Sequence, residues 1–245
     1  MVIAVRNFRY TYLRKKKPVF VPSSVGRRIG AEVKDKVEDL YSFDPMFFHL
    51  RDGGHVAAIH SHRDNAFFAK IDIENFFYSV SRRRVRSALN RIGCDKVEFY
   101  SKWSTVRNPF RDPPYSLPYG FVQSPVLATL VLATSEFGKH LQSLPKSISV
   151  SVYMDDIALS SNNSVALSDA FASTKAALEK EGFKSSKAKE ADAVDSIAIF
   201  NCDLSQGLTE VQPSRIEKFE TEMRSADSEK AFEDYCASVA RGNWA

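Results

Sequence analysis

The sequence predicts an α+β fold in which antiparallel strands are backed by helices. Apolar residues alternate over 149–152 and 157–160, which predicts two strands joined by a tight turn. The run that begins at residue 67 also has strand character, whereas 126–141 and 164–181 are long enough and apolar enough for buried or amphipathic helices. Short strands that alternate with helices in this way are typical of an α+β domain.

Helix signals surround the first of these strands. The charged segment 31–40 repeats apolar residues at helical spacing, which predicts a short helix. Ser81 is the expected N-cap of another helix over 82–92, and Gly93 is its expected end. The proline-rich segment 107–115 is expected to be a loop, because proline lacks an amide donor and restricts its neighbour.

The helix over 126–141 has a defined beginning. Ser124 is its expected cap, and Pro125 fits the first turn, where a missing amide hydrogen costs nothing. Gly120 then lies in the loop that enters this helix, a place where backbone can approach a ligand closely.

The last third of the chain predicts one more helix, one more hairpin and a helical end. Helix 164–181 stops at a glycine. Segments 197–200 and 208–211 frame a turn that contains Gly207, so we expect them to pair. Residues 213–245 have an exposed helical pattern without a motif.

Charge is concentrated near the start of the chain. At 245 residues the protein can bury a real core, and its formal net charge is only +4. Residues 1–30 contain no Asp or Glu, and their basic residues are Arg6, Arg9, Arg14, Lys15, Lys16, Lys17, Arg27 and Arg28. With interleaved aromatic residues, this segment predicts binding to phosphate backbones and bases, and the alternative is a solvated basic arm that maintains solubility.

Three cysteines and the absence of long apolar runs indicate the compartment. Cys94, Cys202 and Cys236 are scattered, which argues against disulfides or a zinc site. No apolar run is long enough to span a bilayer, and no signal peptide is evident. We therefore expect a soluble, cytoplasmic protein without membrane partners.

An acidic pair lies at the tip of the predicted hairpin, in Tyr153-Met154-Asp155-Asp156. Neighbouring strand side chains point to opposite faces and like charges repel, so two adjacent carboxylates are costly there. A divalent cation such as Mg²⁺ would remove that cost, because it prefers hard oxygen ligands. The alternative is an ordinary turn rich in Asp.

A third carboxylate favours the metal site. Asp72 lies near the end of the strand-like run and precedes the aromatic pair Phe76-Phe77. Two strands that bring Asp72 beside Asp155 and Asp156 would form an acidic site for two metals about 4 Å apart, as polymerases use for in-line phosphoryl transfer.

An ordered set of motifs over roughly residues 20–215 resembles the palm motifs of reverse transcriptases. The set comprises Asp72 with Phe76-Phe77, Leu117-Pro118-Tyr119-Gly120 through Ser124-Pro125, Tyr153-Met154-Asp155-Asp156, and Gly182 with Lys187. Gly26–Ile29 resembles the fingers motif of that family, and His55–His62 resembles the segment before its first catalytic Asp. The style is closest to the short bacterial enzymes of the retron, group II intron and phage-defence types.

The resemblance implies a right-hand polymerase fold. Residues 1–66 would form the fingers with the basic N-terminal arm, and 67–212 would form an antiparallel palm with finger elements inserted at about 81–116. Residues 213–245 would form a reduced C-terminal thumb, so grip on the duplex would depend on a protein partner, an oligomer or structured RNA.

The resemblance also implies roles for site residues. Asp72 and Asp155 would hold two Mg²⁺ ions, or Mn²⁺, with the Ile73 carbonyl and Asp156 completing the site. Lys187 would lie near the leaving pyrophosphate as an acid, although surface lysines are common.

Nucleotide contacts follow in the same way. Arg27 or Arg28 would clamp the triphosphate. Phe77 would exclude a 2′-hydroxyl and so select deoxynucleotides, although the Phe76-Phe77 pair also suits a core. Tyr119 stands beside Gly120 where many members carry Gln, which replaces an expected polar contact to the nucleotide sugar.

Three functions fit these motifs. The first is an RNA-directed DNA polymerase that uses dNTPs, a DNA primer and an RNA template or noncoding RNA in a bacterial retroelement or antiviral defence system. The second is a template-independent or protein-primed polymerase on the same palm, suggested by Tyr119 and the short thumb. The third is a non-catalytic nucleic-acid-binding subunit, against which the three intact carboxylates argue.

Overall fold

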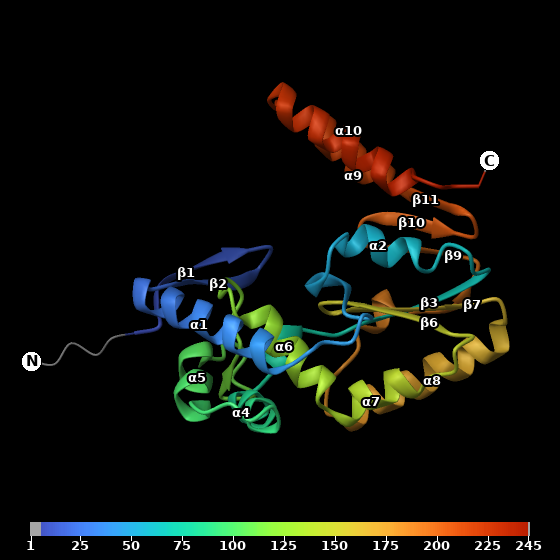
Figure 1. The fold of residues 1–245 in the computed structure, drawn as a ribbon. Helices are drawn as coiled ribbons and strands as arrows, with labels where there is room; N and C mark the ends of the chain where they lie inside the picture. Colours follow the sequence, from blue (N-terminus) through green and yellow to red (C-terminus); the bar gives the residue numbers. More distant parts are fainter. Residues whose placement is uncertain (1–5, 245) are drawn as a thin grey trace, which may run out of the picture. The chain divides into compact units, whose positions relative to one another are not determined.

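The computed structural model describes residues 6–244, so the first five residues of the predicted basic arm lie outside it. The chain divides into two compact units (Figure 1). The first unit contains residues 1–44 and 73–142, and the second contains residues 45–72 and 143–245. Each unit is therefore discontinuous in sequence, and the ranges of fingers, palm and thumb stay a prediction.

The second unit contains a four-stranded antiparallel sheet in the order β6-β7-β3-β8. Its strands are β3 (Phe67–Asp72), β6 (Ser149–Tyr153), β7 (Asp156–Ser161) and β8 (Ala191–Val194). Helix α8 (Ser164–Lys180) packs on one face, and helix α2 (Gly54–His60) lies on the other (Figure 1). The predicted hairpin and the predicted strand before it are both confirmed.

A smaller antiparallel sheet corrects the second predicted hairpin. Its strands are β9 (Ser196–Ile199), β10 (Cys202–Ser205) and β11 (Leu208–Val211), with β10 in the middle. Segments 197–200 and 208–211 therefore do not pair with each other, and Gly207 turns from β10 into β11. Strand β10 is difficult to recognise in the sequence, because only Cys202 and Leu204 of its four residues are buried and its polar residues, Asp203 and Ser205, are typical of a turn.

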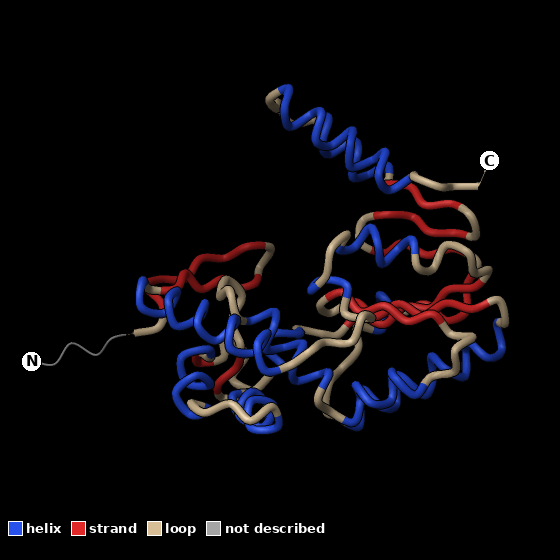
Figure 2. Tube along the Cα trace, in the orientation of Figure 1, coloured by secondary structure: helices blue, strands red, loops and turns tan. Residues whose placement is uncertain are grey.

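One apolar cluster joins these elements of the second unit, whose helices and strands Figure 2 distinguishes by colour. Ile59 of α2 packs with Phe68 of β3, with Ile197 of β9 and with Leu204 of β10. Helices α9 (Pro213–Glu220) and α10 (Ala226–Ala240) complete the unit. They are largely exposed, as predicted, and Val239 is the buried residue that fixes α10 to the cluster.

The residues after α10 are held by the second unit. The Trp244 amide donates to the Gly207 carbonyl at 2.8 Å, and a Cβ atom on Gly207 would lie 2.5 Å from the Trp244 ring. The Asn243 side chain donates to the Thr209 carbonyl at 3.0 Å, and Arg63 donates to the Arg241 carbonyl at 2.7 Å. These contacts fix the segment against the β10–β11 turn.

The first unit is built around helix α6 (Ser124–Ala133), of which nine of the ten residues are buried. Around α6 lie α1 (Ser24–Leu40), α3 (Phe76–Ser79), α4 (Arg82–Arg91) and α5 (Val97–Ser104). Two short hairpins complete the unit, β1 (Phe8–Arg14) with β2 (Lys17–Pro22) and β4 (Val106–Arg107) with β5 (Tyr115–Ser116). The predicted loop 107–115 is thus mostly a loop with a paired residue at each end.

The single helix predicted over 126–141 is wrong, because two helices occupy this range. Helix α6 ends at Ala133 and α7 (Glu136–Ser143) begins after Ser135. The Ser135 hydroxyl donates to the Leu132 carbonyl at 2.6 Å and accepts from the Gly138 amide at 3.3 Å, so it competes with continuous helical bonding. No helix within residues 6–244 has the length and apolarity needed to cross a bilayer.

The cap of α6 also differs from the prediction. Gln123 occupies the N-cap position, and Ser124 is the first helical residue. The Ser124 hydroxyl donates instead to the Pro118 carbonyl at 2.8 Å, which ties the helix to the loop before it. Pro125 does lie in the first turn, as expected.

Helix α1 starts seven residues before the predicted range 31–40. The Ser23 hydroxyl caps it by accepting from the Gly26 amide at 3.0 Å. The predicted boundary was late because the first turns contain two glycines, which disfavour a helix. Arg27 and Arg28 consequently belong to a helix.

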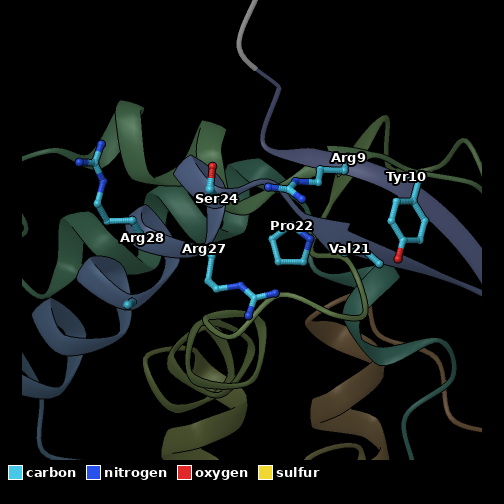
Figure 3. A pocket seen from close by; sticks show the side chains of 8 residues that line it. Arg9, Tyr10, Val21, Pro22, Ser24, Arg27 and Arg28 are labelled. Carbon is cyan, nitrogen blue, oxygen red and sulfur yellow. The ribbon is translucent and has the colours of Figure 1, made fainter.

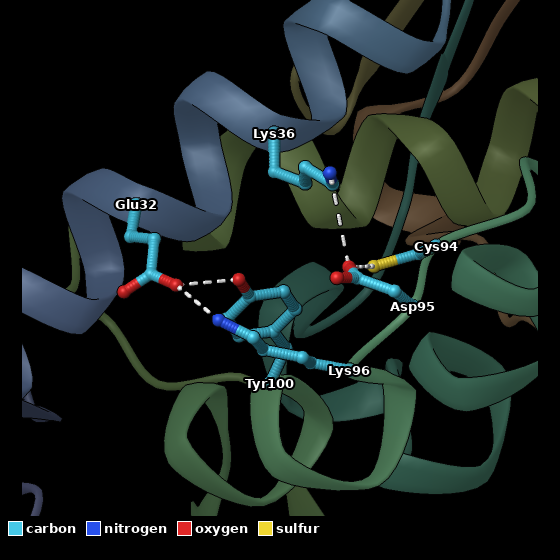
Figure 4. A network of polar contacts seen from close by, with 6 residues as sticks. All are labelled: Glu32, Lys36, Cys94, Asp95, Lys96 and Tyr100. Atoms are coloured by element: carbon cyan, nitrogen blue, oxygen red, sulfur yellow. Dashed lines mark hydrogen bonds and ion pairs between the residues drawn. The ribbon is translucent and has the colours of Figure 1, made fainter.

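Polar contacts tie α1 to the segment around α5 (Figure 4). The Tyr100 hydroxyl donates to Glu32 at 2.6 Å, and the Lys96 ammonium lies 3.3 Å from the same carboxylate. These hydrogen bonds lower the pKa of Glu32. Lys36 and Asp95 form a longer ion pair at 3.8 Å beside them.

The remaining helix predictions are confirmed to within one or two residues. Ser81 caps α4 by accepting from the Arg84 amide at 3.2 Å, and Gly93 follows the helix with φ +72°. Asn163 caps α8, which ends just before the predicted residue 181.

Gly120 connects the β1–β2 hairpin to the loop that enters α6. The Phe20 amide donates to the Tyr119 carbonyl at 2.8 Å. Gly120 has φ +99°, and a Cβ atom there would lie 2.3 Å from the Phe20 carbonyl oxygen. Both observations require glycine at this position.

We therefore expect Gly120→Ala to lower the thermal midpoint of unfolding by about 6–12 °C, from a cost of about 3 kcal/mol for strain and overlap. Gly93→Ala is the matched control, since Gly93 also has positive φ but has open space around its Cβ position. The control should lose only about 2–4 °C by circular dichroism. Equal losses in the two variants would contradict the close approach at Gly120.

Candidate active site

The acidic pair lies at the end of the β6–β7 hairpin, as predicted. Tyr153 pairs with Asp156, so Met154 and Asp155 form the two-residue turn. Met154 adopts a left-handed conformation with φ +59°, which is uncommon outside glycine. Its amide donates to Nδ1 of His49 at 3.2 Å, so a partly buried ring from a neighbouring segment supports the strained turn.

Strand pairing brings the third carboxylate to the same end of the sheet. Strand β3 runs antiparallel to β7, and Asp72 is directly opposite Asp156. Side chains of directly opposed residues in antiparallel strands start about 5 Å apart at Cβ. Asp72, Asp155 and Asp156 are therefore brought together within the second unit, as the sequence predicted.

The electrostatics of this cluster are unfavourable without a cation. Burial, together with the neighbouring charges of Asp155 and Asp72, raises the pKa of Asp156 to about 6. A carboxyl group whose pKa rises on folding is less stable when ionised in the folded protein than in the unfolded chain. At neutral pH the cluster thus reduces stability, and a bound cation would oppose that effect.

Lys189 supplies positive charge to the cluster. Its ammonium lies 2.7 Å from Oδ2 of Asp72, and Asp72 itself is only 5% exposed. The backbone holds the two segments together as well, because the Ser186 amide donates to the Asp72 carbonyl at 2.9 Å. The side-chain hydrogen bond between Lys189 and Asp72 raises the pKa of Lys189.

Lys189 was not selected from the sequence, which favoured Lys187. Both belong to the short helical turn Lys187–Lys189, and Lys187 is exposed there. The sequence offers no signal to separate them, because Lys184 is a third lysine in the same stretch. The role of Lys187 stays a prediction, whereas the contact of Lys189 with Asp72 is observed.

The donor set suits a hard divalent cation. The three side chains at this end of the sheet offer only carboxylate oxygens, the ligands that Mg²⁺ prefers. As they stand, no three Asp, Glu, His or Cys side chains among residues 6–244 are close enough to share one ion. In addition, one Asp72 oxygen is already occupied by the ion pair with Lys189.

A buried histidine joins the two strands of the hairpin beneath the carboxylates. The ring nitrogens of His62 lie 2.7 Å from the hydroxyls of Ser160 on β7 and Ser151 on β6. All three side chains are almost fully buried. Burial lowers the pKa of His62 to about 4, so the ring is neutral at physiological pH.

The predicted sugar-contact residues come together within the first unit. Phe76 is only 1% exposed and belongs to the core, whereas Phe77 is partly exposed. The Phe77 ring packs edge-on against the Tyr119 ring, with a centroid distance of 4.8 Å. The Lys17 ammonium lies 3.4 Å from the Tyr119 hydroxyl. Gly120 follows Tyr119 in the loop already described.

Arg27 and Arg28 line a cleft at the start of α1, which we call the Arg27 cleft. It has a volume of about 530 Å³ and is bounded by α1 and the β1–β2 hairpin (Figure 3). Its other lining residues are Arg9, Tyr10, Val21, Pro22, Ser24 and Ala31. Three guanidinium groups beside the positive end of a helix favour an anionic ligand. Arg9 was predicted only as part of the basic arm.

Ile73 follows Asp72 directly in the chain and is 1% exposed. Its predicted carbonyl contact to a metal stays a prediction.

A family model for reverse transcriptases (RNA-dependent DNA polymerases) matches residues 11–211. The chain belongs to this reverse transcriptase family. The match spans both predicted halves of the carboxylate site and the loop that contains Tyr119 and Gly120. No curated protein matches the chain in sequence.

Two solved structures have a similar fold at low sequence identity. A foamy viral protease-reverse transcriptase in complex with double-stranded DNA has a TM-score of 0.53 at 16% identity, over 88% of this chain and 32% of that chain. Telomerase from Candida albicans in complex with a fragment of telomeric RNA has a TM-score of 0.55 at 13% identity, over 77% and 39%. The reverse transcriptase fold is thus shown, and this chain spans about a third of the length of these proteins.

The His62 contacts predict how the stability of the second unit depends on pH. The folded pKa of about 4 lies below the ordinary value of 6.5, so the unfolded chain binds more protons between these values. The contribution of His62 to stability should therefore fall as pH decreases from 6.5, by about 2 kcal/mol at pH 5. Urea unfolding at several pH values measures this loss.

His62→Gln is the informative variant for this test. It should weaken the protein at all pH values and flatten the pH dependence. A residual slope is expected from His49, whose pKa burial also lowers to about 4. An unchanged slope in the variant would contradict the assignment to His62.

Proposed function

We propose that this protein is an RNA-directed DNA polymerase that joins dNTPs to a primer 3′-hydroxyl by two-metal phosphoryl transfer. The observation that carries the proposal is the strand register that puts Asp72 opposite Asp156, beside the Asp155 turn, in a chain of the reverse transcriptase family. Three buried or half-buried carboxylates at one sheet end are costly unless a cation compensates them.

The carboxylates have defined roles in this proposal. Asp72, Asp155 and Asp156, with the Ile73 carbonyl, would hold two Mg²⁺ ions, for which Mn²⁺ can substitute. Bound there, the ions would supply the charge that activates the primer hydroxyl and stabilises the leaving pyrophosphate. His49 and His62 keep the hairpin in place beneath them.

Residues of the first unit would bind the nucleotide. Arg27 and Arg28, with Arg9, offer guanidinium groups to the triphosphate in the Arg27 cleft. Phe77 and Tyr119 present two packed rings, of which Phe77 would exclude a 2′-hydroxyl. Gly120 keeps the adjacent backbone accessible.

A lysine would assist the departing pyrophosphate. We assign Lys187 to this role, with Lys189 paired to Asp72 through its hydrogen bond. The raised pKa of Lys189 keeps that side chain charged at neutral pH, which suits an electrostatic role rather than proton donation.

The partners follow from the reaction. They are an RNA template or noncoding RNA, a DNA primer and dNTPs, in a bacterial retroelement or antiphage defence system. The structures of similar fold were solved with double-stranded DNA and with telomeric RNA, which supports nucleic-acid partners for this chain. Helices α9 and α10 offer little buried surface, so a protein partner or second copy would strengthen the grip on the duplex.

Tyr119 favours one second candidate. A phenol that contacts Lys17 and Phe77 replaces the amide that many relatives carry, which would alter how the sugar and template are read. Template-independent or protein-primed nucleotide addition on the same palm is therefore the alternative.

A primer-extension assay tests the proposal and separates the alternatives. Purified protein with Mg²⁺ should extend a DNA primer on an RNA template with dNTPs. Asp155→Asn should lower the rate about a thousandfold or more, because a charged metal ligand contributes several kcal/mol. Asp169→Asn is the matched control on the exposed face of α8 and should retain activity.

Two results would contradict the primary proposal. Incorporation without template would favour the alternative, and product at the Asp155→Asn level under every condition would exclude catalysis by this chain. Sequencing the nucleic acid that co-purifies would identify the RNA it carries.

The sugar-selection role of Phe77 gives a separate prediction. Phe77→Val removes a partly exposed ring and should raise the ratio of ribonucleotide to deoxynucleotide kcat/KM by on the order of tenfold to a hundredfold. Phe99→Val is the control, since it removes an exposed ring of α5 that has no role in the proposed nucleotide site. If Phe77→Val leaves the ratio unchanged while the control behaves as wild type, Phe77 does not select the sugar.

A further inference from the structure

A second cleft of the first unit shares no residue with the Arg27 cleft or with the carboxylate cluster. We call it the Trp103 pocket, and its volume is about 300 Å³. Its walls come from the start of β1, the first residue of α4, the end of α5 and both strands of the β4–β5 hairpin. Elements distant in sequence thus converge on one small cavity.

The charged residues that line the Trp103 pocket are all cationic. They are Arg6, Arg82, Lys102 and Arg107, and none of the described residues that line it is acidic. Four cations around one cavity repel each other, so the site lowers its electrostatic energy by binding an anion. The net charge of the chain is only +4, so this grouping is not a general property of its surface.

Aromatic rings form the rest of the wall. Phe8, Trp103 and Tyr115 line the pocket, and Tyr115 is 44% exposed. Inorganic phosphate cannot stack on aromatic rings, whereas a nucleobase can. Cations and flat rings in one cavity therefore match a nucleotide, which offers both a phosphate and a base.

The pocket is organised before any ligand arrives. Nε of Arg82 donates to the Thr105 hydroxyl at 2.7 Å, and its guanidinium carbon lies 3.9 Å from the centre of the Tyr115 ring. The Asn7 side chain donates to the carbonyls of Trp103 at 3.0 Å and Thr105 at 2.9 Å, which fixes the opposite wall. Such preorganisation reduces the entropy lost on binding.

Two of the cations are available to a ligand. Lys102 and Arg107 are exposed, and the side chain of neither forms a hydrogen bond or ion pair with another described residue. Arg82, by contrast, is already placed by Thr105 and Tyr115. The pocket therefore has fixed groups for the base and mobile groups for the phosphates.

One stretch of chain borders both clefts of the first unit. Arg6, Asn7 and Phe8 line the Trp103 pocket, and the next two residues, Arg9 and Tyr10, line the Arg27 cleft (Figure 3). Basic side chains therefore continue from one cleft into the next. This arrangement suits an extended polyanion better than an isolated small molecule.

We propose that the Trp103 pocket binds one unstacked nucleotide of a single-stranded nucleic acid, with Trp103 and Tyr115 contacting the base and Lys102 and Arg107 contacting its phosphates. A cavity of this volume is too small for a base pair, so the nucleotide must be unpaired. The inference rests on the proposed function only in that the protein handles nucleic acid, and it adds a binding site outside the catalytic residues.

Fluorescence anisotropy measures this binding without catalysis. The probes are 5′-labelled oligouridylate and oligodeoxythymidylate of about twelve nucleotides, and EDTA replaces Mg²⁺ so that no synthesis occurs. Titration from about 50 to 200 mM salt gives the number of phosphate contacts. The two probes distinguish RNA from DNA as the natural strand, and tighter binding of either one supports the site.

The double variant Lys102→Ala/Arg107→Ala should weaken binding and lower the slope of log affinity against log salt by about 1.4, since each phosphate contact on a single strand contributes about 0.7. Lys146→Ala/Lys230→Ala is the control, with the same loss of charge at two exposed positions. Tyr115→Leu should weaken binding at least about fivefold at unchanged salt slope, because a stacking ring is lost. All variants should keep the wild-type unfolding midpoint within a few degrees.

Crosslinking locates the bound base. Oligouridylate that carries 5-iodouracil should crosslink on irradiation to Trp103 or Tyr115, as mapped by mass spectrometry. The inference is overturned if the crosslinks lie elsewhere, or if the pocket variants bind as the charge-matched control does. It is also overturned if a hexaglutamate peptide binds the pocket as tightly as the oligonucleotides, because the site would then recognise acidic protein segments.

The two proposals fail separately. Loss of primer extension with intact pocket binding would exclude the proposed catalysis and keep the Trp103 pocket. Retained primer extension with no effect of the pocket variants on oligonucleotide binding would exclude the pocket and keep the polymerase.

Discussion

Strand β3 is joined to β7 by six consecutive residue pairs, from Phe67 opposite Ser161 to Asp72 opposite Asp156. Because side chains alternate between faces, a slip of one residue would exchange the two faces of β3 and remove Phe68 from the apolar cluster. The same pairing therefore satisfies the core and positions the acidic site. Hydrophobic burial along β3 therefore holds Asp72 beside Asp156, although the like charges of the two carboxylates repel each other.

The polar groups beneath the hairpin show how this unit supports an unfavourable charge cluster. His62 connects β6 to β7 through two serine hydroxyls, and His49 accepts from the Met154 amide in the turn. His62 is buried and His49 is partly buried, and burial lowers both pKa values to about 4. Neutral, hydrogen-bonded histidines add rigidity without adding charge, so the electrostatics of the site are left to the carboxylates and Lys189.

The parts of the fold that could be predicted depend on local patterns. The β6–β7 hairpin followed from alternation, α4 followed from its cap and the glycine after it, and α8 followed from its amphipathic pattern and the glycine after it. The break between α6 and α7 could not be seen, because Ser135 interrupts an apolar run only through hydrogen bonds to the backbone. Strand β10 was missed because its core contacts come from residues distant in sequence, including Val239.

The same distinction holds for the site. Asp72, Asp155 and Asp156 were predicted to lie together because strand pairing gives carboxylates at strand ends a small number of possible positions, and the strand register puts Asp72 opposite Asp156, next to Asp155 in the turn. Lys189 was not predicted, since which of several nearby lysines reaches Asp72 depends on the short turn Lys187–Lys189. The Trp103 pocket is formed by four separated segments, and no spacing within the chain indicates such a convergence.

The contacts of residues 241–244 affect how the protein can be handled. Arg63 donates to the Arg241 carbonyl, Asn243 bonds to Thr209, and Trp244 covers Gly207, so these last described residues link the segment after α2 to the end of α10 and to the β10–β11 turn. A purification tag or fusion joined to residue 245 would therefore follow a segment that is hydrogen-bonded to the second unit. Its linker should be long enough to avoid pulling on Trp244, and shortening the chain here would open the edge of the smaller sheet.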